Sequence, residues 1–151
     1  MIEIVISQRD HIQPIAKNMR MEDRAEIKRF NPRMTSIRSL NQCFEKSLVG
    51  WTVLKDGVPI AMFGACEPYC MAEEGIIFLL GTDEVKKHAR EFILCSKTYI
   101  SKMLESFKCL SNRIDGNNQL AVRFAKKLLK LMPNNVNLKK GDLGLDIEIR
   151  R

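Results

Sequence analysis

The feature that most constrains the fold is a short apolar run that leads directly into a helical pattern. Five consecutive apolar residues fill positions 76–80, which is typical of a central strand covered on both faces. Gly81 then permits a tight bend, and Thr82 has a side chain suited to a helix N-cap. From Val85 to Phe107 apolar residues recur at spacings of three and four, which predicts one long helix. A strand that opens into a helix N-terminus is a common ligand position in α/β folds, so we expect any small-molecule site here.

The other periodic patterns complete one mixed α/β domain. Residues 50–54 and 58–67 have the character of strands, and the Asp56-Gly57 pair between them indicates a β-hairpin. The remaining predicted strands are residues 1–7, 109–116 and 142–151, and the remaining predicted helices are residues 10–19, 21–30, 36–47 and 118–131. The segment 21–30 is either a separate helix or a continuation of the first after a bend. No repeat, low-complexity tract or linker divides the chain, so we expect a single domain over residues 1–151.

Composition narrows the classes of partner. The chain has 151 residues, of which 45% are hydrophobic, and this is enough for one ordinary core. The formal net charge of +7 raises the question of nucleic acid binding. The basic residues are dispersed among acidic ones and accompany no recognised nucleic-acid-binding motif, so we expect no nucleic acid partner. A solvated basic surface is the favoured interpretation, and an anionic cofactor or polyanionic partner remains compatible with it.

The cysteines and the N-terminal residues suggest a reducing compartment. Five cysteines are odd in number and irregularly spaced, and the N-terminus lacks the basic region and the small-residue cleavage site of a secretory signal. We therefore expect reduced thiols in a cytoplasm-like setting. Cys66 and Cys70 lack partners at the spacing of a closed zinc site, so no metal is expected. No apolar run approaches the roughly 20 residues of a membrane-spanning helix.

The order of elements resembles the GNAT fold of acetyl-coenzyme A-dependent N-acetyltransferases. The motif LLGTDE at Leu79–Glu84 is similar to one in a branch of tailed-phage GNAT-like proteins that includes the internal virion protein A of short-tailed phages. A second motif of that branch, N-x-x-A-x-R-F, is matched by Asn118, Ala121, Arg123 and Phe124. The resemblance extends from Asp10 to Leu131. It implies an α/β (α+β) domain with a mixed, mostly antiparallel sheet flanked by helices.

The resemblance also implies a cofactor, acetyl-coenzyme A, and a place for it. In active members of the family the fourth and fifth strands separate, and the pantetheine arm pairs with backbone exposed between them. By position, this backbone would come from Leu79, Leu80 and Gly81. Amides of the fourth strand would also stabilise the oxyanion. Asn118 matches an asparagine that lies near the cofactor arm in the family.

One expected motif is missing from the sequence. Residues 85–90 stand where the family has a glycine-rich turn that binds the pyrophosphate. Lys86, Lys87 and Arg90 are our candidates to compensate, because positions three and four apart share a helix face. The alternative is that these three residues form a solvated helix face.

The acid and base groups also depart from the family pattern. Asp83 and Glu84 suit the helix dipole but compete with a pyrophosphate for the same positive end. The family's tyrosine position in the last helix falls near Ala125, which has no proton to give. Glu74, beside an apolar strand end, is our candidate proton acceptor. Its alternative is an exposed loop carboxylate.

Two functions follow from the resemblance. In the first, the protein is an acyl-coenzyme A-dependent N-acyltransferase for an amine of a protein or a small molecule. In the second, it is a catalytically inactive GNAT-fold component of a virion, or one that binds a host protein. The implied partner is a host or phage protein, and the implied location is the host cytoplasm or the virion. Whether the chain forms a homodimer is left open.

Overall fold

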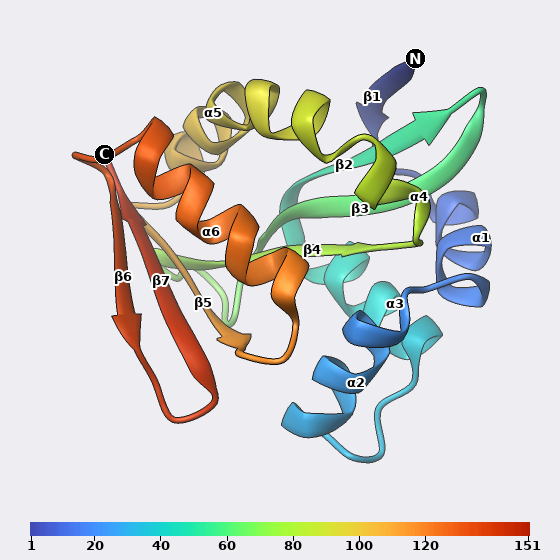
Figure 1. The fold of residues 1–151 in the computed structure, drawn as a ribbon, viewed down its shortest axis with the longest axis horizontal. Coiled ribbons are helices and arrows are strands. Elements are labelled where there is room, and N and C mark those ends of the chain that lie inside the picture. Colours follow the sequence, from blue (N-terminus) through green and yellow to red (C-terminus); the bar gives the residue numbers. More distant parts are fainter.

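The computed structural model describes all residues from 1 to 151 as a seven-stranded sheet with helices on both faces (Figure 1). The strands are β1 (Ile2–Ile6), β2 (Ser47–Lys55), β3 (Val58–Cys66), β4 (Glu74–Gly81), β5 (Cys109–Asp115), β6 (Val136–Lys140) and β7 (Gly144–Arg150). The helices are the 3-10 helix η1 (Arg9–His11), α1 (Ile12–Lys17), α2 (Met21–Phe30), α3 (Ser36–Lys46), α4 (Glu84–Lys87), α5 (Ala89–Ser106) and α6 (Gln119–Leu131). None of these helices combines the length and apolar character that a membrane crossing requires.

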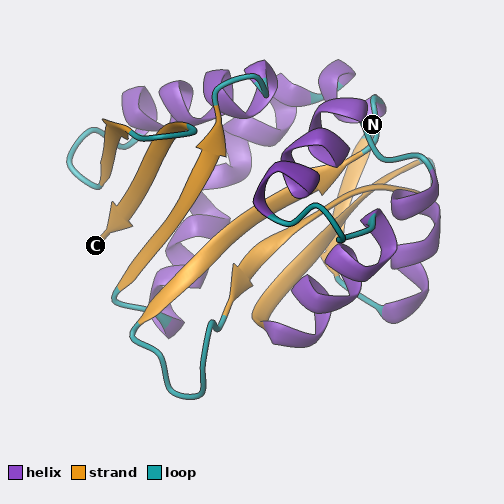
Figure 2. Ribbon diagram, turned by 90° about the horizontal axis from the view of Figure 1, so that it is seen from below, coloured by secondary structure: helices purple, strands orange, loops and turns teal.

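The sheet has the order β1-β2-β3-β4-β5-β7-β6. Only β4 and β5 run parallel, while every other neighbouring pair is antiparallel. The twisted sheet and the helices on its two faces are seen from another direction in Figure 2. The predicted mixed, mostly antiparallel α/β architecture is therefore confirmed.

The core consists of two layers, one on each face of the sheet. β4 contributes to both, because its side chains alternate between the faces. Ile77 and Leu79 pack against the larger cluster beneath α5 and α6. Phe78 and Leu80 belong to the smaller cluster beneath α1 and α3. The continuous apolar run predicted for a strand covered on both faces is thus explained by its packing.

The predicted hairpin is confirmed, and the strands on either side of it extend over nine residues each. Asp56 and Gly57 connect β2 to β3 with positive φ angles of 50° and 81°. Two consecutive residues with positive φ match the twist of the flanking strands, which is why Asp-Gly is favoured here.

The predicted single helix from Val85 onward is wrong, since the chain breaks at His88 between α4 and α5. The apolar spacing continues across the break, so periodicity alone does not reveal it. Thr82 is also not the N-cap: Asp83 holds that position, and no side chain bonds to the helix there. Thr82 instead continues the pairing of β4 with β3, because its amide donates to the carbonyl of Ile60 at 2.8 Å.

Strand β6 is absent from the sequence prediction. It lies at the edge of the sheet and pairs antiparallel with β7. Only Val136 of this strand is buried, and its other residues include two lysines and an asparagine. Its extended conformation is stabilised by pairing with β7 rather than by local propensity, which the sequence pattern does not encode.

Candidate ligand cavity between strands β4 and β5

The two parallel strands separate soon after they begin to pair. Their register holds for three residue pairs, the last of which joins Ile76 to Ser111. Beyond this point β4 continues to Gly81 and β5 to Asp115 without further pairing. Asn112 stands at the fork, where its Nδ2 donates to the carbonyl of Ile77 at 2.7 Å. The separation that the family resemblance implies is therefore present in this fold.

The backbone of β4 faces the gap at every second residue. The Ile77 carbonyl and the Gly81 amide both bond to groups on the gap side, so the alternation directs the amide and carbonyl of Leu79 there as well. Those of Leu80 face β3 instead. The Gly81 amide is already engaged, because it donates to Oδ2 of Asp23 at 3.1 Å. Of the three residues that the resemblance assigned to the cofactor backbone, Leu79 therefore has the orientation best suited to a ligand.

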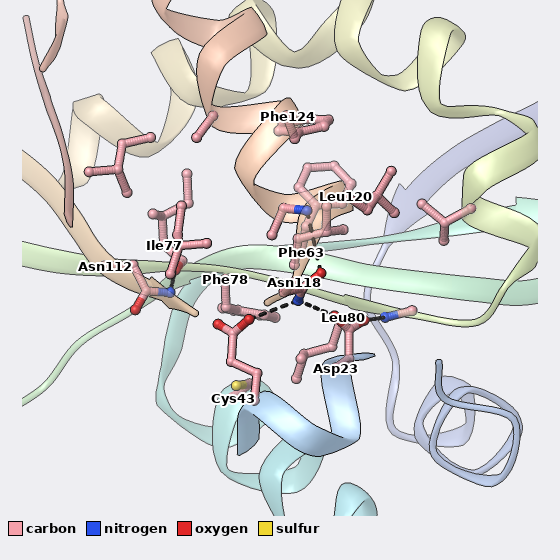
Figure 3. A pocket seen from close by; sticks show the side chains of 18 of the residues that line it. Asp23, Cys43, Phe63, Ile77, Phe78, Leu80, Asn112, Asn118, Leu120 and Phe124 are labelled. Carbon is pink, nitrogen blue, oxygen red and sulfur yellow. Dashed lines mark hydrogen bonds between the residues drawn. The ribbon is translucent and has the colours of Figure 1, made fainter. Parts of the chain in front are cut away.

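A cavity of about 300 Å³ lies in this gap and reaches both faces of the sheet. Its walls are mostly apolar. Figure 3 shows Leu120 and Phe124 of α6 on one side of β4, and Asp23 and Cys43 on the other. Because β5 no longer pairs with β4 here, the cavity connects the two faces of the sheet. This arrangement suits a long, flexible ligand that passes through the sheet.

A buried polar network closes the end of the gap near Gly81. The guanidinium of Arg20 donates to both carboxylate oxygens of Asp23 at 3.0 and 3.3 Å, and to Oδ1 of Asn118 at 2.8 Å. Nδ2 of Asn118 donates in turn to Asp23 at 3.0 Å. Arg20 is 2% exposed and Asp23 6% exposed, so removing one partner would leave the other as an unpaired buried charge. Asn118, expected from the resemblance to lie near the cofactor arm, is the N-cap of α6 and the centre of this network.

Glu26 extends the network into the cavity wall. Its Oε2 accepts a hydrogen bond from Nδ2 of Asn118 at 2.7 Å, and the residue lines the cavity. Burial raises the pKa of Glu26 to about 7, with the charge of Asp23 adding to this rise and the Asn118 hydrogen bond opposing it. A carboxyl group with this pKa is divided between its two protonation states near neutral pH, so it can accept a proton there.

Sequence reasoning missed Glu26. The residue lies in a helix rich in charged side chains, where an exposed carboxylate is the ordinary expectation. Its spacing of three from Asp23 does place both carboxylates on one helix face. Only the contact with Asn118, which is 92 positions away in the sequence, distinguishes it from a solvated glutamate.

The structure does not bring Glu74, the predicted proton acceptor, to the cavity. Glu74 is exposed at the first residue of β4, where the strands are still paired, and it accepts a hydrogen bond from the hydroxyl of Ser111. The cavity begins further along β4, at Ile76. The role assigned to Glu74 stays a prediction that its position does not favour.

The three predicted phosphate-binding cations do not share one helix. Lys86 and Lys87 lie on α4, whereas Arg90 is exposed on α5 beyond the break. Nζ of Lys86 lies 3.3 Å from Glu22, and Nζ of Lys87 lies 2.8 Å from Glu84. Both lysines are thus neutralised by carboxylates, and their role toward a phosphate stays a prediction.

Comparisons with known proteins agree on the fold. A scan against protein-family models gave no match, and a search of curated proteins gave no similar sequence. Among solved structures, PaiA N-acetyltransferase from Thermoplasma acidophilum, in complex with coenzyme A, has a TM-score of 0.62 at 11% identity and covers 100% of this chain and 99% of its own. A GNAT-family acetyltransferase from Streptococcus pneumoniae has a TM-score of 0.61 at 10% identity, with 100% and 98% covered. Aminoglycoside 6′-acetyltransferase type Ii has a TM-score of 0.65 at 10% identity, with 99% and 96% covered.

These similarities run over essentially the whole length of both chains. They identify the architecture as the GNAT fold. At such low identity the similarity is one of fold, and the functional argument depends on the residues of the cavity itself.

Proposed function

We propose that the protein binds an acyl-coenzyme A thioester between β4 and β5 and transfers the acyl group to an amine of a protein or a small molecule. The observation that carries this proposal is the separation of the strands after Ile76 and Ser111, with a mostly apolar cavity passing through the sheet. An unpaired strand edge binds extended amide-containing chains through backbone hydrogen bonds. The gap-facing amide and carbonyl of Leu79 would hold the pantetheine arm in this way. The similar fold of PaiA N-acetyltransferase, solved with coenzyme A, supports the same proposal.

The cavity residues on the face of the sheet opposite α6 are suited to binding the acceptor amine. Glu26 lines the cavity from α2, on the face opposite α6, and Asn118 fixes its carboxylate. The bound acyl thioester supplies the electrophilic carbonyl carbon. The amine nitrogen forms a bond to that carbon, Glu26 accepts the amine proton, and the carbon–sulfur bond breaks to release the thiolate. Ala125, which lines the cavity at the family's tyrosine position, offers no proton, so we assign protonation of the thiolate to solvent.

A second candidate function is binding without turnover, as a component of a virion or a partner of a host protein. Two observations favour it. Asp23 occupies the Gly81 amide that a cofactor would otherwise use, and Glu22 and Glu84 neutralise the lysines of α4. In this alternative the cavity and the surrounding charged helices would form a docking surface.

Calorimetric titration with acetyl-coenzyme A tests the cofactor binding on which the acyltransferase depends. Micromolar binding that weakens at raised salt would support the acyltransferase, because a phosphate group contributes through its charge. Desulfo-coenzyme A should bind in the same range, since it retains the pantetheine arm and the phosphates. No binding at millimolar ligand would reject the acyltransferase and favour the docking role.

Two matched variants test the proton acceptor once turnover is detected. Glu26→Gln should lower kcat by about 100-fold, whereas Glu74→Gln should leave kcat within about twofold of the unmodified protein. Both variants replace one carboxylate of the same length by an amide. A large loss in Glu74→Gln with little change in Glu26→Gln would reverse the assignment.

A further inference from the structure

Two buried side-chain atoms in this protein lack a hydrogen-bond partner, and both lie at the same corner. They are Nη1 of Arg20 and Oγ1 of Thr82. The two residues are neighbours across the chain, because Met19 forms a β-bridge with Thr82 and the Arg20 amide donates to the carbonyl of Gly81 at 2.9 Å. Folded proteins rarely leave buried donors unpaired, since each one loses its hydration without compensation. A ligand that supplies acceptor oxygens would give these two buried groups hydrogen-bond partners.

A carboxylate already lies next to the unpaired guanidinium nitrogen. Oε2 of Glu22 is 3.5 Å from Nη1 of Arg20 and 3.3 Å from Nζ of Lys86. Burial alone would raise the pKa of Glu22, but contact with Lys86 and the charge of Arg20 lower it. Oε2 of Glu22 therefore lies between two cations from different elements, Arg20 at the start of α2 and Lys86 within α4.

Neutralising Arg20 does not explain the position of Glu22. Asp23 already pairs with the guanidinium through two hydrogen bonds, which satisfies its charge. At 3.5 Å, Glu22 is also too far from Nη1 to form a good hydrogen bond, so the nitrogen stays unpaired. The side chain of Glu22 is 35% exposed and can turn out to solvent without unfolding the protein.

We propose that Arg20 and Lys86 bind a phosphate or diphosphate group, and that Glu22 occupies this position as a stand-in anion which the ligand displaces. A phosphate group presents more acceptor oxygens than a carboxylate, so it can reach Nη1 and Lys86 together. Asp83, whose Oδ1 lies 3.7 Å from Lys86, is mostly exposed and moves aside with little cost. Where the proposed acyltransferase function holds, this group is the diphosphate of the coenzyme. The site would then be built from side chains and would replace the missing glycine-rich turn.

Titration with inorganic pyrophosphate tests the site independently of catalysis. Glu22→Gln removes the competing carboxylate and should tighten pyrophosphate binding about tenfold, which corresponds to about 1.4 kcal/mol. The matched control is Glu84→Gln, which removes a carboxylate of equal charge from Lys87 on the same short helix. This control should change the affinity by less than about twofold, because exposed charges are screened by salt. Lys86→Gln should weaken binding in either background.

Several results would overturn the proposal. These are an unchanged or weaker affinity in Glu22→Gln, an equal gain in Glu84→Gln, or no pyrophosphate binding by any variant at millimolar concentration. Thermal unfolding of each variant verifies that the fold is retained. Repeating the titrations with acetyl-coenzyme A separates the two proposals. If Glu22→Gln binds pyrophosphate more tightly but no variant binds the coenzyme, the anion site is supported and the acyltransferase is rejected. If the coenzyme binds with the same affinity in Glu22→Gln as in the unmodified protein, only the anion site is rejected.

Discussion

The raised pKa of Glu26 makes a prediction about stability that does not depend on catalysis. In the unfolded chain this carboxyl ionises near its ordinary pKa of 4.5, whereas in the folded protein its pKa is about 7. Between these values the folded state holds a proton that the unfolded state has lost. The free energy of unfolding must therefore fall as the pH rises from about 4.5 to about 7, and the loss is complete above that range. Replacing Glu26 by glutamine removes this loss.

The size of the effect follows from the shift. At about 1.36 kcal/mol for each pKa unit, the difference of about 2.5 units amounts to at most about 3.4 kcal/mol. The side chain of Glu26 is only half-buried, so solvent screens part of the effect and we expect about 2 kcal/mol. Glutamine retains an oxygen that can accept the hydrogen bond from Asn118, so the variant should leave the local network intact.

Urea denaturation at a series of pH values between 4 and 8.5 measures this directly. Glu26→Gln should match the unmodified protein near pH 4, where both side chains are neutral, and exceed it by about 2 kcal/mol at pH 8. Glu105→Gln, at an exposed position of α5, is the control and should give a curve parallel to that of the unmodified protein. A stability difference between Glu26→Gln and the unmodified protein that does not change with pH would refute the reasoning.

Three further perturbations test the site and its supports. Asn118→Ala removes an amide that bonds to a buried ion pair and should lower the unfolding free energy by about 3 kcal/mol, measured by urea denaturation. Gly81→Ala should cost about 1–3 kcal/mol in the same assay, because an added Cβ would lie 2.6 Å from Cγ2 of Val85. The double variant Lys86→Glu with Arg90→Glu should abolish coenzyme A affinity in calorimetry, and unchanged affinity would remove the phosphate role given to these two residues.

Much of the fold could be predicted because its elements carry local signals. The apolar run at 76–80 indicated a strand covered on both faces, and β4 does contribute to both core layers. The Asp56-Gly57 pair indicated a hairpin, and both residues adopt the positive φ angles that the turn requires. The pattern over residues 118–131 indicated a helix, and α6 follows Asn118, whose Oδ1 accepts a hydrogen bond from the Ala121 amide. In each case the signal lies within a few residues of the structure that it describes.

The candidate site could be predicted only in part. The resemblance located it at the end of β4, and this is where the cavity lies. It assigned the Gly81 amide to a cofactor, but in the folded protein Asp23, 58 positions away in the sequence, accepts that hydrogen bond. Glu74 was chosen as proton acceptor for its place beside an apolar strand end, and in the structure it lies at the paired end of β4 outside the cavity.

Local patterns in the sequence specify most of the elements, the side of each that faces the core, and the β2–β3 turn, because periodicity and turn chemistry act over short distances. They do not specify β6 or the break between α4 and α5. The tertiary structure decided where β4 and β5 part, which carboxylate is buried, and which cations are paired. Glu26 acquires its raised pKa only because α2 packs beside Asn118. The guanidinium of Arg20 contacts Glu22 and Asp23 of α2 and Asn118 at the start of α6, and its Nη1 is left without a hydrogen bond. Such properties arise from desolvation and from partners distant in the sequence, so no local pattern encodes them.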